Sequence, residues 1–120
     1  MGASTNWQED LKTAVINISG AGDNVLVEAP NTGSYLAIDF VQLIPTNAVT
    51  VTFYSGTVVE GQTAITGPYP LSQQQVVTDE NVFQHQKGVM TCADARSFVI
   101  NLGGAVQCGG FIRYRIVGNN

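Results

Sequence analysis

Apolar residues recur at every second position along most of this chain, and this period of two is the feature that most constrains its fold. In the clearest case Val49, Val51 and Phe53 alternate with Thr50 and Thr52. Successive side chains of a β-strand point to opposite faces, so such a segment buries one face and half-exposes the other. Branched threonine side chains fit a pleated surface of this kind. The pattern predicts an all-β protein.

Other segments repeat this alternation. Val25 and Val27 are predicted to share one face of a strand, and Leu36, Ile38 and Phe40 to share one face of another. Two more rows lie near the C-terminus: Phe98, Ile100 and Leu102, and then Ile112, Tyr114 and Ile116, with Arg113 and Arg115 on the opposite face. We expect residues 97–102 and 108–117 to pair as a hairpin that closes near Gly103 and Gly104.

Glycine, proline and asparagine turn signals separate these rows at spacings of about 8 to 12 residues, which is typical of a sandwich or barrel. The sequence therefore predicts an antiparallel two-sheet sandwich, jelly-roll-like, with about eight strands. The 120 residues fit one domain and contain no internal repeat or linker. We expect an N-terminal arm over residues 1–13 and a single β-sandwich domain over 14–120. Residues 5–12 fit one or two helical turns and a free arm equally well.

Charge is scarce in this chain. Charged residues make up 12% of it, against roughly 25% in an average globular domain. The formal charge of −4 argues against a nucleic-acid partner, since phosphate binding needs clustered Lys and Arg. No apolar run approaches the length of a membrane span, and the N-terminus lacks the regions of a secretion signal. We expect no membrane partner and no export.

Catalytic and metal-binding patterns are missing from the sequence. The single histidine, His85, has no partner at metal-ligand spacing, and no serine lies in a nucleophile elbow. The nine acidic residues are scattered, and neighbouring positions on a strand point to opposite faces. We therefore predict a protein that is not an enzyme, with no catalytic residue, no metal and no cofactor.

The two cysteines are Cys92 and Cys108. Their spacing fits no zinc pair, and the expected hairpin would hold their α-carbons too far apart for a disulfide. The sequence predicts two free, buried thiols.

Four stretches resemble, in order and spacing, a family of small tailed-phage virion proteins, the β-sandwich head decoration or cement proteins. The stretches are "DNVLVEAP", "YLAIDFVQLIPTNAVTVTFYSGT", "ITGPYPL" and "VMTCADARSFVINLGGAVQCGGFIRYRIV", which together lie between residues 23 and 117. The resemblance implies a structural protein that binds the outer surface of a phage capsid and stabilises it. It also implies a homotrimer, the major capsid protein as partner, and a place on the virion surface after assembly in the host cytoplasm. Since the same sandwich occurs in phage tails and fibres, the alternative is a module that binds a host glycan or another virion protein.

An uncharged stretch, "GPYPLSQQQVV" at residues 67–77, is the candidate contact between subunits. Glutamine both donates and accepts hydrogen bonds and avoids burying an unpaired charge. We therefore select, as contact residues, Tyr69, Leu71, Gln73 and Gln75. Alternatively, the flanking prolines only keep an edge strand from aggregating.

The N-terminal arm supplies the candidate capsid contact, which consists of Trp7, Gln8 and Leu11. Trp7 and Leu11 form a small apolar patch on an otherwise polar segment, and aromatic anchors dominate interface energetics. In the alternative interpretation, Trp7 covers an open end of the sandwich.

Overall fold

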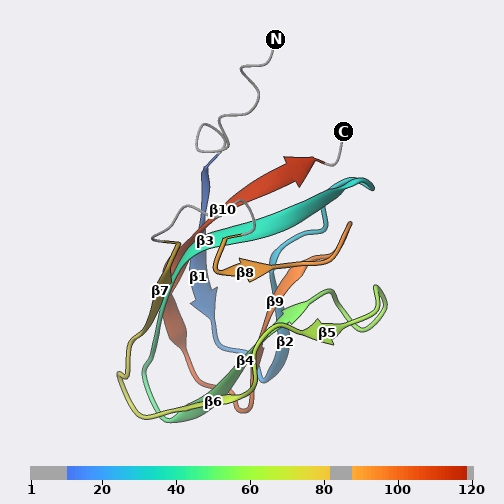
Figure 1. Cartoon of the computed structure of the whole chain (residues 1–120). Helices are drawn as coiled ribbons and strands as arrows, with labels where there is room; N and C mark the ends of the chain where they lie inside the picture. The colour runs from blue at the N-terminus through green and yellow to red at the C-terminus, as the bar shows by residue number, and fades with distance from the viewer. Residues whose placement is uncertain (1–10, 82–87, 119–120) are drawn as a thin grey trace.

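The computed structural model describes residues 11–81 and 88–118, which fold into two antiparallel β-sheets packed face to face (Figure 1). The strands are β1 (Lys12–Ile18), β2 (Gly22–Val27), β3 (Ser34–Pro45), β4 (Val49–Ser55), β5 (Thr63–Ala64), β6 (Tyr69–Leu71), β7 (Val77–Glu80), β8 (Met90–Thr91), β9 (Phe98–Leu102) and β10 (Cys108–Gly118). Neither described range contains a helix, and so neither contains one able to cross a membrane.

The strand order confirms the predicted sandwich and its jelly-roll character. Sheet A has the order β1-β10-β3-β7, with β8 also paired to β3, and sheet B has the order β2-β9-β4-β5, with β6 also paired to β4. Both β5 and β6 pair with the same edge of β4, and both β7 and β8 with the same edge of β3. The edge of sheet B thus consists of two short strands, β5 and β6, and the edge of sheet A of β7 and β8. If each pair is counted as one interrupted strand, the ten strands occupy eight positions, four in each sheet, in the order of a jelly roll.

The core lies between the inner faces of the two sheets. Phe53 of β4 stacks on Phe98 of β9 with ring centroids 5.8 Å apart, and Tyr69 of β6 meets Phe53 edge-on. Sheet A contributes, among others, Leu36 and Val41, both with no exposed surface. Each such side chain stabilises the fold by about 1.5–3 kcal/mol through burial.

The predicted shared face of Leu36, Ile38 and Phe40 is wrong, because a β-bulge interrupts β3. Ile38 pairs with Tyr114, but Phe40 pairs with the next residue back, Arg113, so Asp39 is one extra residue in β3. The insertion moves Phe40 to the outer face, where its ring lies 5.1 Å from that of Phe111.

A second bulge corrects the prediction for Val25 and Val27. These two residues pair with the consecutive residues Val99 and Phe98, so Leu26 is the extra residue in β2. As a result Val27 is buried while Val25 keeps 46% of its surface exposed.

The predicted hairpin of residues 97–102 and 108–117 is also wrong. β9 pairs with β2 and β4 in sheet B, whereas β10 pairs with β1 and β3 in sheet A. In a jelly roll most consecutive strands belong to opposite sheets, so a short connection between two strands need not close a hairpin.

Candidate binding surfaces

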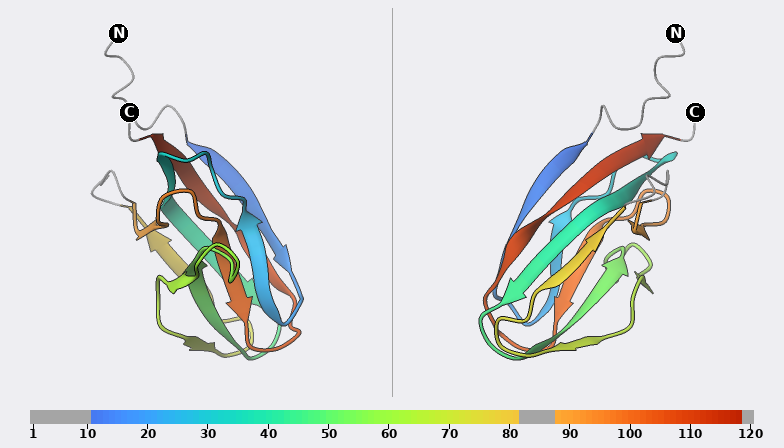
Figure 2. Two further views of the ribbon diagram at one scale, coloured as in Figure 1. Left: turned by 90° about the vertical axis from the view of Figure 1, so that its right-hand side faces the viewer. Right: turned by 60° about the vertical axis from the view of Figure 1, so that its left-hand side comes forward.

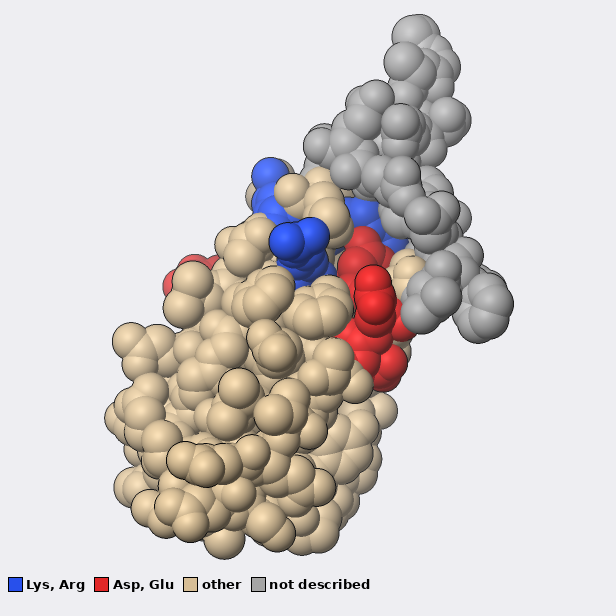
Figure 3. Space-filling model, turned by 90° about the vertical axis from the view of Figure 1, so that its left-hand side faces the viewer, with Lys and Arg blue, Asp and Glu red and all other residues tan. Residues whose placement is uncertain are grey.

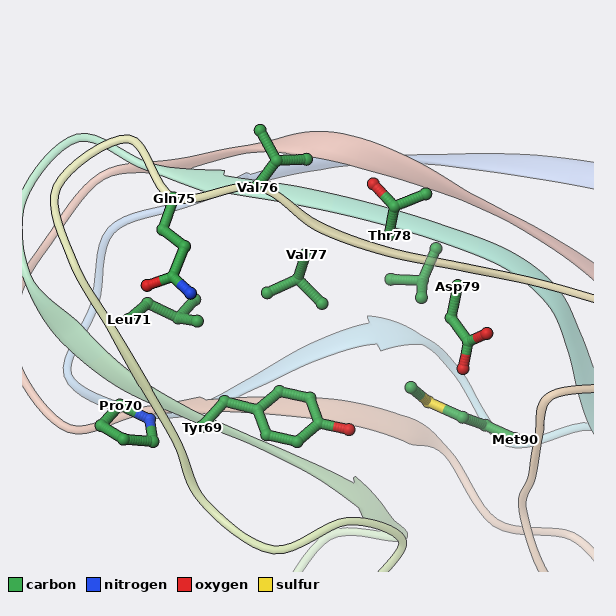
Figure 4. Close-up of a pocket in the computed structure, with 10 residues that line it drawn as sticks. Tyr69, Pro70, Leu71, Gln75, Val76, Val77, Thr78, Asp79 and Met90 are labelled. Atoms are coloured by element: carbon green, nitrogen blue, oxygen red, sulfur yellow. The ribbon is translucent and has the colours of Figure 1, made fainter.

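A cleft of about 400 Å³ opens between β6 of sheet B and β7 of sheet A (Figure 4). Its walls are Val41, Tyr69, Pro70, Leu71, Gln75, Val76, Val77, Thr78, Asp79 and Met90. Figure 4 shows Val77 and Asp79 on the cleft side of the strand, and Val76 and Thr78 on the other side. The Tyr69 ring lies along the cleft, so an aromatic surface and a carboxylate are presented in the same recess.

The predicted subunit-contact residues all lie in or beside this cleft. Leu71 is part of the core with 7% of its surface exposed, and Tyr69 is half-buried against Phe53. Gln73 and Gln75 are exposed, and the Gln75 side chain accepts a hydrogen bond from the Ser72 backbone amide at 2.8 Å. The exposed part of the predicted contact is therefore the glutamine turn.

Of the predicted capsid-contact residues, Trp7 and Gln8 lie outside the described residues, as does His85. Leu11 precedes β1 and is 42% exposed. The strand itself begins at Lys12.

The outer face of sheet A is a second surface, and it consists of three rows of residues across four strands. From β1 to β7 the rows are Thr13, Arg113, Phe40 and Glu80; Val15, Phe111, Gln42 and Thr78; and Asn17, Gly109, Ile44 and Val76. The pairing of β3 with β7 includes the first two rows, and Val76 extends it by one residue beyond β7. Figure 2 (right) shows these four strands side by side toward the viewer.

Five of the twelve positions on this outer face are apolar, although the exposed positions of a solvated sheet are ordinarily polar. Val15 is 71% exposed, Val76 is 51% exposed and Ile44 is 37% exposed. Its only charged positions are Arg113 and Glu80, both in the first row. From the same side of the molecule, Figure 3 shows the charged residues gathered at one end and an uncharged surface over the rest.

A buried ion pair joins Asp39 of β3 to Arg115 of β10, next to the row that contains Phe40 and Arg113. The guanidinium of Arg115 donates to both carboxylate oxygens of Asp39, from Nε at 2.5 Å and from Nη2 at 2.9 Å. Arg115 is 1% exposed. The Asn81 side chain donates to the same carboxylate at 2.9 Å. Charge-assisted pairs of this bidentate geometry are strong, so the pair fixes the bulge of β3 against β10.

The loop between β4 and β5 is held by a carboxylate. Glu60 accepts hydrogen bonds from the backbone amides of Thr57 and Ser97 and from the Ser97 hydroxyl, each at 3.0 Å. The amide of Ser97 is the main cause that lowers the pKa of Glu60 below its ordinary value. The loop carries Val58 and Val59, which are 74% and 97% exposed.

The two thiols are free and buried, which confirms the prediction. Burial raises the pKa of Cys92 to about 12 and also raises the pKa of Cys108. Within residues 11–81 and 88–118, no group of three or more His, Cys, Asp or Glu side chains is arranged to hold a metal ion.

The outer face of sheet A was not among the contact surfaces predicted from the sequence. A signal for it exists at residues 40–44, "FVQLI", where apolar residues occupy both phases of the alternation. Such a run predicts a strand covered on both faces. Its outward residues, Phe40 and Ile44, lie on that outer face.

Comparison with family models, with curated proteins and with solved structures found no match to this chain. The fold and these surfaces therefore define its class, a jelly-roll sandwich with one apolar outer sheet face, and carry the functional argument.

Proposed function

We propose that this protein is a non-catalytic structural protein of a phage virion, which binds the outer surface of the capsid and stabilises it. The observation that carries the proposal is the outer face of sheet A, where apolar side chains stand exposed and charge is confined to one row. Apolar side chains exposed together on one sheet face are typical of protein contact sites. A surface of this kind acts through contact area, which is what a cement protein supplies.

Two further observations support the assignment to a virion. Jelly rolls recur in viral capsid proteins, although a fold alone does not define a function. The order of motifs between residues 23 and 117 resembles that of head decoration proteins.

Co-sedimentation with undecorated capsid shells, taken from the phage that carries this chain, tests the proposal. The protein is expected to pellet with the shells at a saturating ratio of copies to shell. Because few charged side chains are available, raising the salt concentration should leave binding nearly unchanged. Folded protein that stays in the supernatant at every concentration would contradict the proposal.

Within this proposal the arm residues Trp7, Gln8 and Leu11 dock on the major capsid protein. Deleting residues 1–10 removes Trp7 and Gln8 but leaves β1, which begins at Lys12, complete. The truncated chain is expected to keep its unfolding midpoint and to lose shell binding. A lower midpoint would instead favour a role for Trp7 in covering the sandwich, and unchanged shell binding would exclude the arm.

The cleft between β6 and β7 favours a second candidate, a tail or fibre module that binds a host glycan. It places an aromatic ring and a carboxylate, those of Tyr69 and Asp79, in one recess of about 400 Å³. Pockets in this size range suit small ligands that need a few polar groups for orientation. A glycan array tests it: hits that disappear with Asp79→Ala support the candidate, and an array without hits removes it.

A further inference from the structure

The outer face of sheet A is complementary to itself. We propose that a second copy of this chain docks on it, related to the first by a twofold axis that runs along β3. The inference rests on the proposed function, in which this face acts through contact area, and it names a second copy as what the face contacts, so that the arm residues remain the contact with the shell. In place of the threefold arrangement expected from the resemblance, it pairs copies two by two through identical faces.

The first line of evidence is charge. Arg113 on β10 and Glu80 on β7 lie in the same row, one strand to either side of Phe40 on β3. A twofold axis along β3 superposes β10 of one copy on β7 of the other. Arg113 of each copy then faces Glu80 of its partner, and the two ion pairs form symmetrically. The only two charges of the face are both used.

The second line of evidence is side-chain size. The same operation brings Val76 of one copy over Gly109 of the other, and Phe111 over Thr78. A Cβ atom on Gly109 would meet no atom closer than 4.0 Å, so the glycine leaves a hollow in the face that its own fold does not need. Large residues therefore meet small ones on both sides of the axis, as interdigitated sheet faces require.

Other twofold axes do not bring Arg113 opposite Glu80. An axis between β10 and β3 places Glu80 over Thr13 and Arg113 over Phe40, so that no ion pair forms. An axis across the strands superposes β10 on β10, which keeps Arg113 away from Glu80.

The area over which the two copies overlap determines how tightly the dimer is expected to bind. Three strands and three rows overlap, an area of about 15 Å by 20 Å from the ordinary spacing of strands and of residues along them. This lies below the size of a standard interface. We therefore expect a dimer that dissociates on dilution.

Sedimentation equilibrium of the full chain, from low micromolar to submillimolar concentration, tests the proposal. The wild-type average mass should rise with concentration toward that of a dimer. Arg113→Glu and Glu80→Arg, each alone, place like charges opposite each other and should raise the dissociation constant at least about tenfold. An equimolar mixture of these two variants should associate as the wild type does, because each supplies the charge that the other needs. Glu28→Arg, which makes the same charge change at an exposed position off this face, should leave association unchanged.

Two pairs of variants test where the axis lies. Gly109→Leu fills the hollow and should weaken association, whereas Gly104→Leu, in a loop with open space around it, should not. Val76→Asp should weaken association more than Val15→Asp, although Val15 is the more exposed, because β1 has no strand opposite it. A greater effect of Val15→Asp would overturn the axis.

Three outcomes of the sedimentation experiment would overturn the twofold proposal. They are a wild-type chain that stays monomeric at submillimolar concentration, a trimeric mass, and a mixture of the two charge variants that associates no better than its components. Unfolding midpoints of every variant, measured at micromolar concentration, show that each is folded. Shell co-sedimentation is measured separately, so that loss of shell binding contradicts the proposed function while leaving a measured dimer in place.

Discussion

The two outer faces of the sandwich differ in how their surfaces are completed. On sheet B the chain covers part of its own face with hydrogen bonds, although Val25 at the edge of the sheet stays 46% exposed. The Gln62 side chain donates to the Asp23 carboxylate at 2.7 Å and to the Gly56 carbonyl at 3.1 Å, and Asn101 donates to the other oxygen of Asp23 at 2.7 Å. The Gln62 bond crosses the row that contains Val99, which has no exposed surface although it points away from the core.

On sheet A the corresponding positions are left open. Val15 has the same side chain as Val99 and also points outward, but it lies on the edge strand β1, whereas Val99 lies on the central strand β9, and Val15 is 71% exposed. Outward apolar residues therefore do not by themselves make a contact site. They make one only where the chain provides no cover of its own.

The largest expected effect comes from placing a charge at these two valines. Val99→Asp buries a carboxylate under the cover of sheet B and should destabilise the fold by more than about 4 kcal/mol. Val15→Asp should change the free energy of unfolding by less than about 0.5 kcal/mol. Denaturant unfolding at micromolar concentration measures both. Similar losses in the two variants would remove the distinction between the faces.

The next effect concerns the buried ion pair beside the open face. Asp39→Ala leaves the Arg115 guanidinium, 1% exposed, without its carboxylate and should cost about 3 kcal/mol. The control is Arg113→Ala on the same strand, where the exposed side chain should matter by less than about 1 kcal/mol. Equal losses would mean that the bulge does not depend on the pair.

A smaller effect is expected from opening the cover of sheet B. Gln62→Ala removes the hydrogen bonds of that side chain to Asp23 and to the Gly56 carbonyl and should lower the free energy of unfolding by about 1 kcal/mol. Gln73→Ala, an exposed glutamine in the turn after β6, serves as the matched change and should be neutral. Faster hydrogen exchange in β9 for Gln62→Ala alone would show that the Gln62 hydrogen bonds protect sheet B.

The smallest effect is a pH dependence in the loop between β4 and β5. Because the pKa of Glu60 is lowered in the folded state, its contribution is present above the ordinary value of 4.5 and is lost as the pH falls through the lowered value. Glu60→Gln should therefore be less stable than the wild type near neutral pH, and the gap should close as the pH falls below 4.5 and through the lowered pKa. A gap that stays constant with pH would show that the charge on Glu60 contributes nothing.

Much of the fold could be predicted from the sequence because strand periodicity is a local property. The alternation around Val51 and Phe53, and the row of Phe98, Ile100 and Leu102, place the same residues in the core that the structure does. The free thiols were also predictable from residue type. The cleft was not predicted, since the uncharged segment at 67–77 was chosen as a subunit contact and was not associated with Thr78, Asp79 and Met90 across the cleft.

The predictions that were wrong concerned features that depend on which strands lie next to each other. The period of two holds only until a bulge, and the extra residues Leu26 and Asp39 are defined by the strand opposite them. For the same reason Arg115, which alternation assigns to an outer face, proves to be among the most buried side chains. Its guanidinium pairs with Asp39, 76 residues away in sequence.

By itself, then, the sequence determined that this chain forms strands with one buried face, an all-β sandwich, because the direction of a side chain on a strand depends only on its neighbours along the chain. Only the tertiary structure decided that β9 and β10 belong to different sheets, that the Asp39 bulge turns Phe40 outward, and that sheet A keeps an apolar face without cover. Each of these depends on contacts between segments far apart in sequence, whose geometry no local pattern records.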